Sequence, residues 1–138
     1  SYGMMNPDKE AIRNSALDQS NIIIHENVSE MGRLMRNCDV AISASGSTSY
    51  ELCATQTPAI TYILADNQIP LANTFDKNGI ISNYGDIRTE GKHALAGKLI
   101  SGAVNLAEDH DERVRIANAM MNVTDGNGAK RIVECIMA

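Results

Sequence analysis

The stretch from Asp39 to Glu51 reads D-V-A-I-S-A-S-G-S-T-S-Y-E, an apolar segment followed by a run of small residues. We expect a strand over Val40–Ala44, a tight turn, and a helix that starts near Thr48. The first N–H groups of a helix have no partner within it and attract anions. Gly46 lacks a Cβ, so a ligand can approach the backbone closely there. The stretch therefore predicts a phosphate-binding turn.

Glu51 lies one turn inside the expected helix and offers a carboxylate to the same site. A carboxylate can accept hydrogen bonds from two neighbouring hydroxyls, and a ribose offers such a pair. An alternative stays open, because Thr48-x-x-Glu51 matches the capping-box pattern and can serve only to close the helix.

A second polar cluster, A-D-N-Q, ends at Gln68 and follows an expected strand over Ala59–Leu64. The side chains of Asp66, Asn67 and Gln68 supply donors and acceptors that suit sugar hydroxyls or amides. The alternative is a solvated turn in which Asp66 caps a helix that starts near Pro70.

Two further apolar segments, Ile22–Ile24 and Ile80–Ser82, are also expected to be strands, with helical patterns between the strands. This alternation predicts one α/β domain over residues 1–138, a Rossmann-like parallel sheet with helices on both faces. Such sheets bind ligands at the carboxyl ends of their strands. The loops expected at these ends are residues 25–29, 43–48 and 65–69.

Helix signals complete the pattern. We expect a helix over Pro7–Asp18 with Asn6 as its N-cap, and Gly79 at the end of the helix that starts near Pro70. The chain reads as helical from Lys92 onward. The residues expected on one buried face of this part are Leu95, Leu99, Ile100 and Val104.

Composition and charge narrow the classes of partner. The 138 residues carry a net charge of −5, with four Tyr, one Phe and no Trp. Proteins that bind nucleic acid need basic surface and often aromatic platforms, so we expect no nucleic-acid partner. No apolar run approaches the ~20 residues of a membrane span, and no secretory signal is found. Cys38, Cys53 and Cys135 lack metal-ligand spacing. We expect a cytoplasmic protein with three reduced, packed thiols, no metal and no cofactor.

Two longer segments resemble a known family. They are N-V-S-E-M-G-R-L-M-R-N-C-D-V-A-I-S-A-S-G-S-T-S-Y-E-L-C-A, from Asn27, and T-P-A-I-T-Y-I-L-A-D-N-Q, from Thr57. They resemble the C-terminal half of the UDP-sugar hydrolases of pseudaminic acid biosynthesis. More distantly, they are similar to the C-terminal domain of the MurG-type N-acetylglucosaminyltransferases. Both families have the GT-B architecture, two Rossmann-like domains that face each other across a cleft. The late D-G-N-G-A-K-R-I-V, from Asp125, also fits the hydrolases, and the resemblance covers residues 21–137.

The resemblance implies a role for each part of the site. The small-residue turn would cradle the UDP phosphates, the glutamate would bind the ribose, and the loop before residue 29 would meet the uracil edge. The A-D-N-Q segment would face the sugar. The nucleotide-binding residues implied are Val28, Ser45, Gly46, Ser47, Thr48 and Glu51, and the sugar-binding residues are Asn67 and Gln68.

The chain also departs from the family pattern. Ser45 stands where the hydrolases usually have a first glycine. The resemblance further implies that the first strand of the domain and the N-terminal domain, which carries a histidine general base, are missing. We therefore expect a domain that holds the UDP leaving group, with an unknown catalytic residue outside this chain. A MurG-like glycosyltransferase subunit and a non-catalytic nucleotide-binding module remain alternatives. A sheet that lacks its first strand exposes an edge, which can pair with a second copy in a homodimer.

Overall fold

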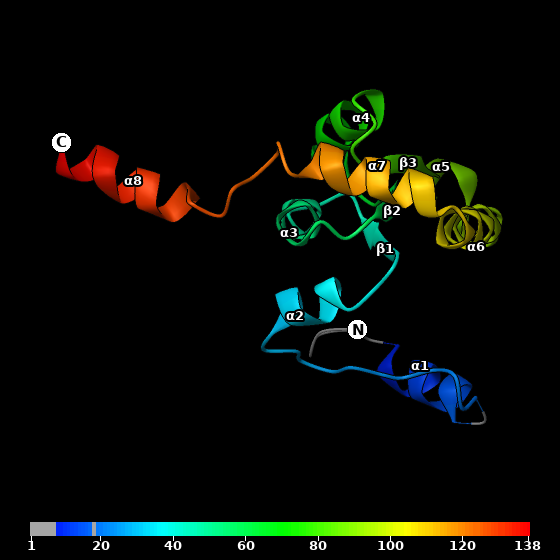
Figure 1. The fold of residues 1–138 in the computed structure, drawn as a ribbon. Coiled ribbons are helices and arrows are strands. Elements are labelled where there is room, and N and C mark those ends of the chain that lie inside the picture. The colour runs from blue at the N-terminus through cyan, green and yellow to red at the C-terminus, as the bar shows by residue number, and fades with distance from the viewer. Residues whose placement is uncertain (1–7, 18) are drawn as a thin grey trace. The chain divides into compact units, whose positions relative to one another are not determined.

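The computed structural model describes residues 8–17 and 19–138 (Figure 1). The chain divides into two compact units, residues 1–31 and residues 32–138, which we describe separately. The first unit contains α1 (Lys9–Ala16), and α2 (Met31–Arg36) begins at the last residue of this unit. The helices of the second unit are α3 (Thr48–Thr55), η1 (Asp66–Gln68, a 3₁₀ turn), α4 (Ile69–Lys77), α5 (Ile87–Glu90), α6 (Lys92–Glu108), α7 (His110–Met120) and α8 (Gly128–Met137).

In the first unit, the predicted strand over Ile22–Ile24 is wrong. These residues form no strand, and the side chains of Ile22 and Ile23 are 45% and 77% exposed. The N–H of Ile22 bonds to the carbonyl of Gln19 at 3.2 Å, so it closes a turn instead of joining a ladder. The predicted helix is present as α1, whereas its expected ends at Asn6, Pro7 and Asp18 lie outside the described residues.

The second unit contains a parallel sheet in the order β1 (Ala41–Ala44), β2 (Ala59–Ile63) and β3 (Ser82–Asp86) (Figure 1). Ala41 pairs with Ala59, and Ile60 pairs with Ser82. Helices flank this sheet, so the predicted Rossmann-like α/β fold class is confirmed. β1 pairs with β2 alone in the described sheet, which places β1 at an edge.

The third strand lies later in the chain than the sequence predicts. The expected strand is Ile80–Ser82, but β3 starts only at Ser82. The N–H of Ile80 instead bonds to the carbonyl of Phe75 at 2.9 Å and closes α4. Gly79 has a φ of 63° at this point, so the predicted C-cap glycine is confirmed. Ile81, 1% exposed, fills the core just before the strand begins.

The core of the second unit lies between the sheet and its helices. Its most completely buried side chains include Leu52, Ile60, Ile81, Leu95 and Met120. The buried face of α6 differs from the prediction, because Gly102 and Leu106 complete it instead of Ile100 and Val104. The latter two side chains are 62% and 49% exposed. Residues 95, 99, 102 and 106 follow the 3.6-residue period of a helix, whereas residue 100 is rotated away from residue 99.

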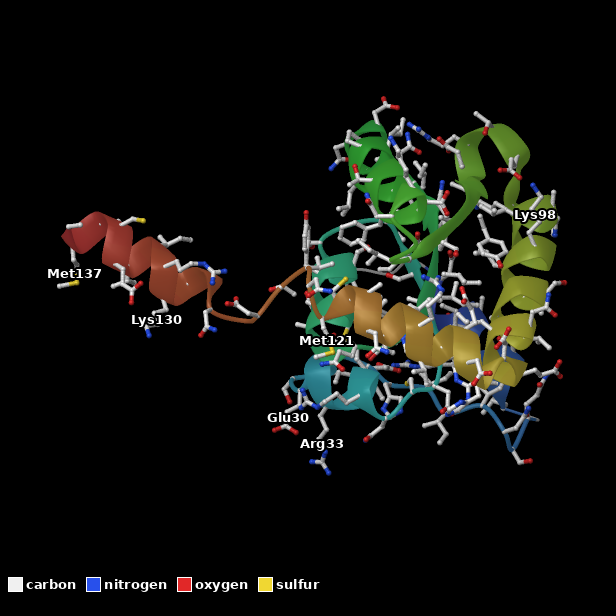
Figure 2. The ribbon with its side chains drawn as sticks, turned by 45° about the horizontal axis from the view of Figure 1, so that its top comes forward. Glu30, Arg33, Lys98, Met121, Lys130 and Met137 are labelled. Carbon is white, nitrogen blue, oxygen red and sulfur yellow. The ribbon has the colours of Figure 1, made fainter. Side chains whose placement is uncertain are left out.

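The C-terminal helix α8 buries none of its residues. Its apolar side chains Ile132, Val133, Ile136 and Met137 are all more than half exposed. Figure 2 labels Lys130, in the first turn of this helix, and Met137, its last residue. Within the described part of the chain, no helix combines the length and the apolar character that crossing a membrane requires.

Candidate functional site

The candidate site lies at the carboxyl edge of the parallel sheet. β1 is followed by the turn that starts at Ser45, β2 by η1, and β3 by the corner that leads into α5. Because the strands are parallel and ordered β1-β2-β3, these three segments follow neighbouring strands at one edge, with η1 in the middle. Ligands of open α/β sheets bind at this edge.

The turn after β1 presents unpaired backbone donors. The N–H of Ser45 bonds to the carbonyl of Tyr62, and that of Gly46 bonds to the carbonyl of Ala44. By contrast, the N–H groups of Ser47 and Thr48 have no hydrogen-bond partner among the described residues. They stand at the N-terminus of α3, where the helix dipole favours negative charge. The turn can therefore offer two N–H groups to an anion.

The side chain of Ser45 is also unusual. Ser45 is 1% exposed, and its Oγ is the one buried side-chain oxygen or nitrogen without a partner in the described part of the chain. A buried hydroxyl without a hydrogen bond is costly. The small side chain at this position is consistent with a turn that has no room for a larger one.

Glu51 lies in the first turn of α3 and is exposed. The capping-box alternative is not observed, because the N-cap residue is Ser47 and no side chain caps this helix. No hydrogen bond or ion pair involves the Glu51 carboxylate among the described residues. The carboxylate is therefore available in the first turn of α3.

The turn η1 lies beside the small-residue turn. A Cβ built on Gly46 would lie 3.7 Å from Nε2 of Gln68. The Oε1 atom of Gln68 accepts a hydrogen bond from the N–H of Leu64 at 2.8 Å, so this side chain is fixed to the end of β2. Its NH2 group is directed to the side of Gly46, and Asn67 is exposed. The structure thus brings the two predicted clusters together.

Asp66 does not cap the following helix, contrary to the alternative that the sequence left open. The N-cap residue of α4 is Gln68, and no side chain caps it. Instead, Oδ1 of Asp66 accepts a hydrogen bond from Nη1 of Arg88 at 2.7 Å. This ion pair joins the turn after β2 to the corner after β3.

Sequence reasoning missed Arg88. Its Nε and Nη2 donate to the two carboxylate oxygens of Asp86 at 2.9 and 2.6 Å. The hydrogen bonds from Arg88 lower the pKa of Asp86 to about 2, and the same carboxylates raise the pKa of Arg88. The sequence feature that could have identified Arg88 is its position just after β3. The predicted third strand, Ile80–Ser82, ends too early to show this position.

One predicted contact stays outside this geometry. Val28 belongs to the first unit, so its uracil contact stays a prediction. A hollow of about 160 Å³ touches Ile60, Ser82 and Gly102, at the opposite edge of the sheet, where β2 and β3 begin. In the described residues, no group of three or more His, Cys, Asp or Glu side chains is arranged to hold a metal ion.

No family model matches the chain. A curated protein of Helicobacter pylori, named pseudaminic acid cytidylyltransferase and UDP-2,4-diacetamido-2,4,6-trideoxy-beta-L-altropyranose hydrolase, is 45% identical to it over 51 residues. These residues are 37% of this chain and 10% of that protein. The chain is therefore related to a part of that protein, and the matched stretch spans a small share of the relative's length.

Proposed function

We propose that this chain is a single UDP-sugar-binding domain of GT-B type, one part of a larger nucleotide-sugar hydrolase of pseudaminic acid or surface polysaccharide biosynthesis. The observation that carries the proposal is that a Cβ built on Gly46 would lie only 3.7 Å from Nε2 of Gln68, because this closeness brings the expected phosphate turn beside the expected sugar turn. The name of the H. pylori relative, which includes a hydrolase of a UDP-sugar, supports the same reaction class.

In this proposal each part of UDP meets the chemistry that suits it. The diphosphate accepts hydrogen bonds from the free N–H groups of Ser47 and Thr48, at the positive end of α3. The carboxylate of Glu51 accepts hydrogen bonds from the ribose hydroxyls. The sugar lies over η1, near Asn67 and the NH2 group of Gln68.

The proposed reaction divides the work between two domains. Water attacks the anomeric carbon of the sugar, the bond to the diphosphate oxygen breaks, and UDP leaves. A general base in a partner domain or subunit takes the proton from the water. The α3 N-terminus stabilises the charge that develops on the leaving diphosphate. This chain therefore binds the leaving group and supplies no general base.

Binding of UDP tests the proposal. Saturation at 100 times Kd should stabilise the chain by about 2.7 kcal/mol, measured as a rise in Tm. Glu51→Ala should weaken UDP binding about tenfold or more, since charge-assisted hydrogen bonds to the ribose are lost. Glu108→Ala removes an exposed glutamate from α6 and should bind UDP like the wild type. The proposal would be refuted if millimolar UDP does not change the Tm of the wild-type chain.

A second measurement separates a hydrolase from a MurG-like transferase. The full-length protein should release UDP from a UDP-sugar when no acceptor is added. UDP release that depends on an added acceptor would instead assign this domain to a glycosyltransferase. The proposed UDP site would then still hold.

We also propose that two copies of the chain pair through β1. This strand has a neighbour on one side in the described sheet, and unpaired strand edges bind other strands.

A further inference from the structure

Arg88 links the carboxyl ends of two neighbouring strands. It lies in α5, directly after β3, and its Nη1 reaches Oδ1 of Asp66 in η1, which follows β2. The two residues are 22 positions apart in the sequence. Its remaining bonds stay within its own corner, because Nε and Nη2 both donate to Asp86. One side chain thus contacts both segments.

The surroundings of Arg88 argue against a direct role in binding phosphate. Two carboxylates, Asp66 and Asp86, share its charge, so the group of three carries a net charge of −1. Three of its five N–H donors are already occupied by these carboxylates. An anion would be repelled by the group, and the free N–H groups of the α3 N-terminus offer a better position.

The turn η1 needs support from outside itself. It is a 3₁₀ turn of three residues without a side-chain cap, and Asp66 and Asn67 are exposed. Its described side-chain anchors are the bond between Gln68 and the N–H of Leu64 and the ion pair between Asp66 and Arg88. These anchors hold the two ends of the turn, with Asn67 between them. These two side-chain bonds join η1 to the end of β2 and to the corner after β3.

We propose that Arg88 is a positioning residue that acts through Asp66 to hold η1 in its sugar-binding conformation. The inference rests on the proposed function, because it assumes that Asn67 and Gln68 face the sugar of a UDP-sugar. Arg88 then sets the preference of the site for a UDP-sugar over UDP. The phosphate turn and Glu51 lie on α3 and its start, so the affinity for UDP itself does not depend on this ion pair.

Calorimetry of the full chain with two ligands, UDP and UDP-N-acetylglucosamine, tests the inference. The measured quantity is the ratio of the two Kd values. In Arg88→Ala the affinity for the UDP-sugar should fall about three- to tenfold, as expected when the competent conformation is populated for a fraction of the time. The Kd for UDP should stay within about twofold of the wild-type value.

Asp66→Asn should produce the same change, because it removes the ion pair and leaves the bonds between Arg88 and Asp86 in place. The double variant should be no worse than either single one, since both remove the same contact. Arg88→Lys should restore part of the preference, because lysine keeps the charge but cannot bridge two carboxylates with a planar fork.

Arg115→Ala is the matched control. Arg115 also pairs with an acidic residue, Glu112, and also donates to a distant group, the carbonyl of Gly79, but it lies on α7. This variant should leave both Kd values unchanged. The inference is overturned if Arg88→Ala weakens both ligands equally, if it weakens neither, or if the wild type binds both equally. Absence of UDP binding by the wild type would instead overturn the proposed function.

Discussion

Gly102 occupies a position on α6 where the structure leaves no room for a side chain. A Cβ at this residue would lie 2.4 Å from three atoms of the Tyr84 side chain. Alanine at this position gains helix propensity but forces the Tyr84 ring to move. On the same helix, a Cβ added to Gly97 would have no atom of the described residues within 4 Å. Alanine substitutions at the two glycines therefore measure separately the gain in helix propensity and the cost of the clash with Tyr84.

We predict that Gly97→Ala stabilises the chain by about 0.5–1 kcal/mol. Gly102→Ala should be less stable than Gly97→Ala by about 1–3 kcal/mol, because it must displace the Tyr84 ring. Urea unfolding of the two variants and the wild type measures both differences. Equal stability of the two variants would show that Tyr84 moves without cost and that Gly102 is not a packing requirement.

Cys53 is the thiol that the fold protects. The sequence predicts three packed thiols, but only Cys53 is buried, while Cys38 and Cys135 are exposed. Burial raises the pKa of Cys53 from its usual 9.0 to about 11. Since the thiolate is the reactive form, iodoacetamide at pH 8 should label Cys38 and Cys135 and spare Cys53 until the chain unfolds. Mass spectrometry of tryptic peptides reads the result, and rapid labelling of Cys53 in the native chain would contradict it.

The raised pKa of Cys53 determines how the stability of the chain changes with pH. The folded state holds the Cys53 proton more tightly than the unfolded state, so the stability from this group is complete below pH 9 and declines between pH 9 and about 11. Cys53→Ala should therefore lose stability less steeply than the wild type over this range. Parallel slopes for the two proteins would contradict the shift.

Among the elements, those with strong local signals could be predicted from the sequence. The strand over 40–44 and the helix over Thr48–Thr55 appear within one residue of their expected bounds, because an apolar run meets a small-residue turn there. The segment Ile22–Ile24 has the composition of a buried strand, but a strand also requires a partner, which local sequence does not encode.

The error at the third strand also explains the residue that was missed. β3 reads S-N-Y-G-D, with neither an apolar run nor regular alternation, while the isoleucines before it look more like a strand. Placing the strand at Ile80–Ser82 hid the fact that Asp86 and Arg88 follow its true end. The adjacency of Gly46 and Gln68 could be expected, since both follow parallel strands, but the bond from Arg88 to Asp66 depends on side-chain geometry.

The start of α7 depends on one cap. Oδ1 of Asp109 accepts a hydrogen bond from the N–H of Glu112 at 2.9 Å, at the junction with α6. We predict that Asp109→Ala lowers the free energy of unfolding by about 1 kcal/mol, because an N–H at the helix start loses its partner. Asp109→Asn keeps a capping oxygen and should stay near the wild-type stability. Thermal unfolding checks both, and a stable Asp109→Ala variant would show that water replaces the cap without cost.

At the scale of the whole molecule, the site is built from segments that are far apart in the chain. Three consecutive strand ends supply a pair of free N–H groups, a polar turn and an arginine that ties this turn to the next strand. All three segments belong to the second unit, residues 32–138. The parallel sheet fixes their spacing, so the arrangement depends on the core more than on any one loop.

The proposed dimer is a property of the same sheet. The edge strand β1 carries Ile42, whose side chain is 48% exposed. A two-fold axis beside this edge would set β1 antiparallel to its copy and continue the sheet across both chains. Light scattering after size-exclusion chromatography should give a mass that rises from one chain toward two as the concentration increases.

Charge at the edge should prevent this pairing. Ile42→Lys places an ammonium group on β1, and lysine on an edge strand opposes strand addition. We therefore predict a monomer at concentrations where the wild type is a dimer. Ile100→Lys makes the same chemical change on α6, at a side chain that is 62% exposed, and should still dimerise. A wild-type chain that remains monomeric at millimolar concentration would refute the pairing. So would a dimer that Ile42→Lys leaves intact, because any association would then use another surface.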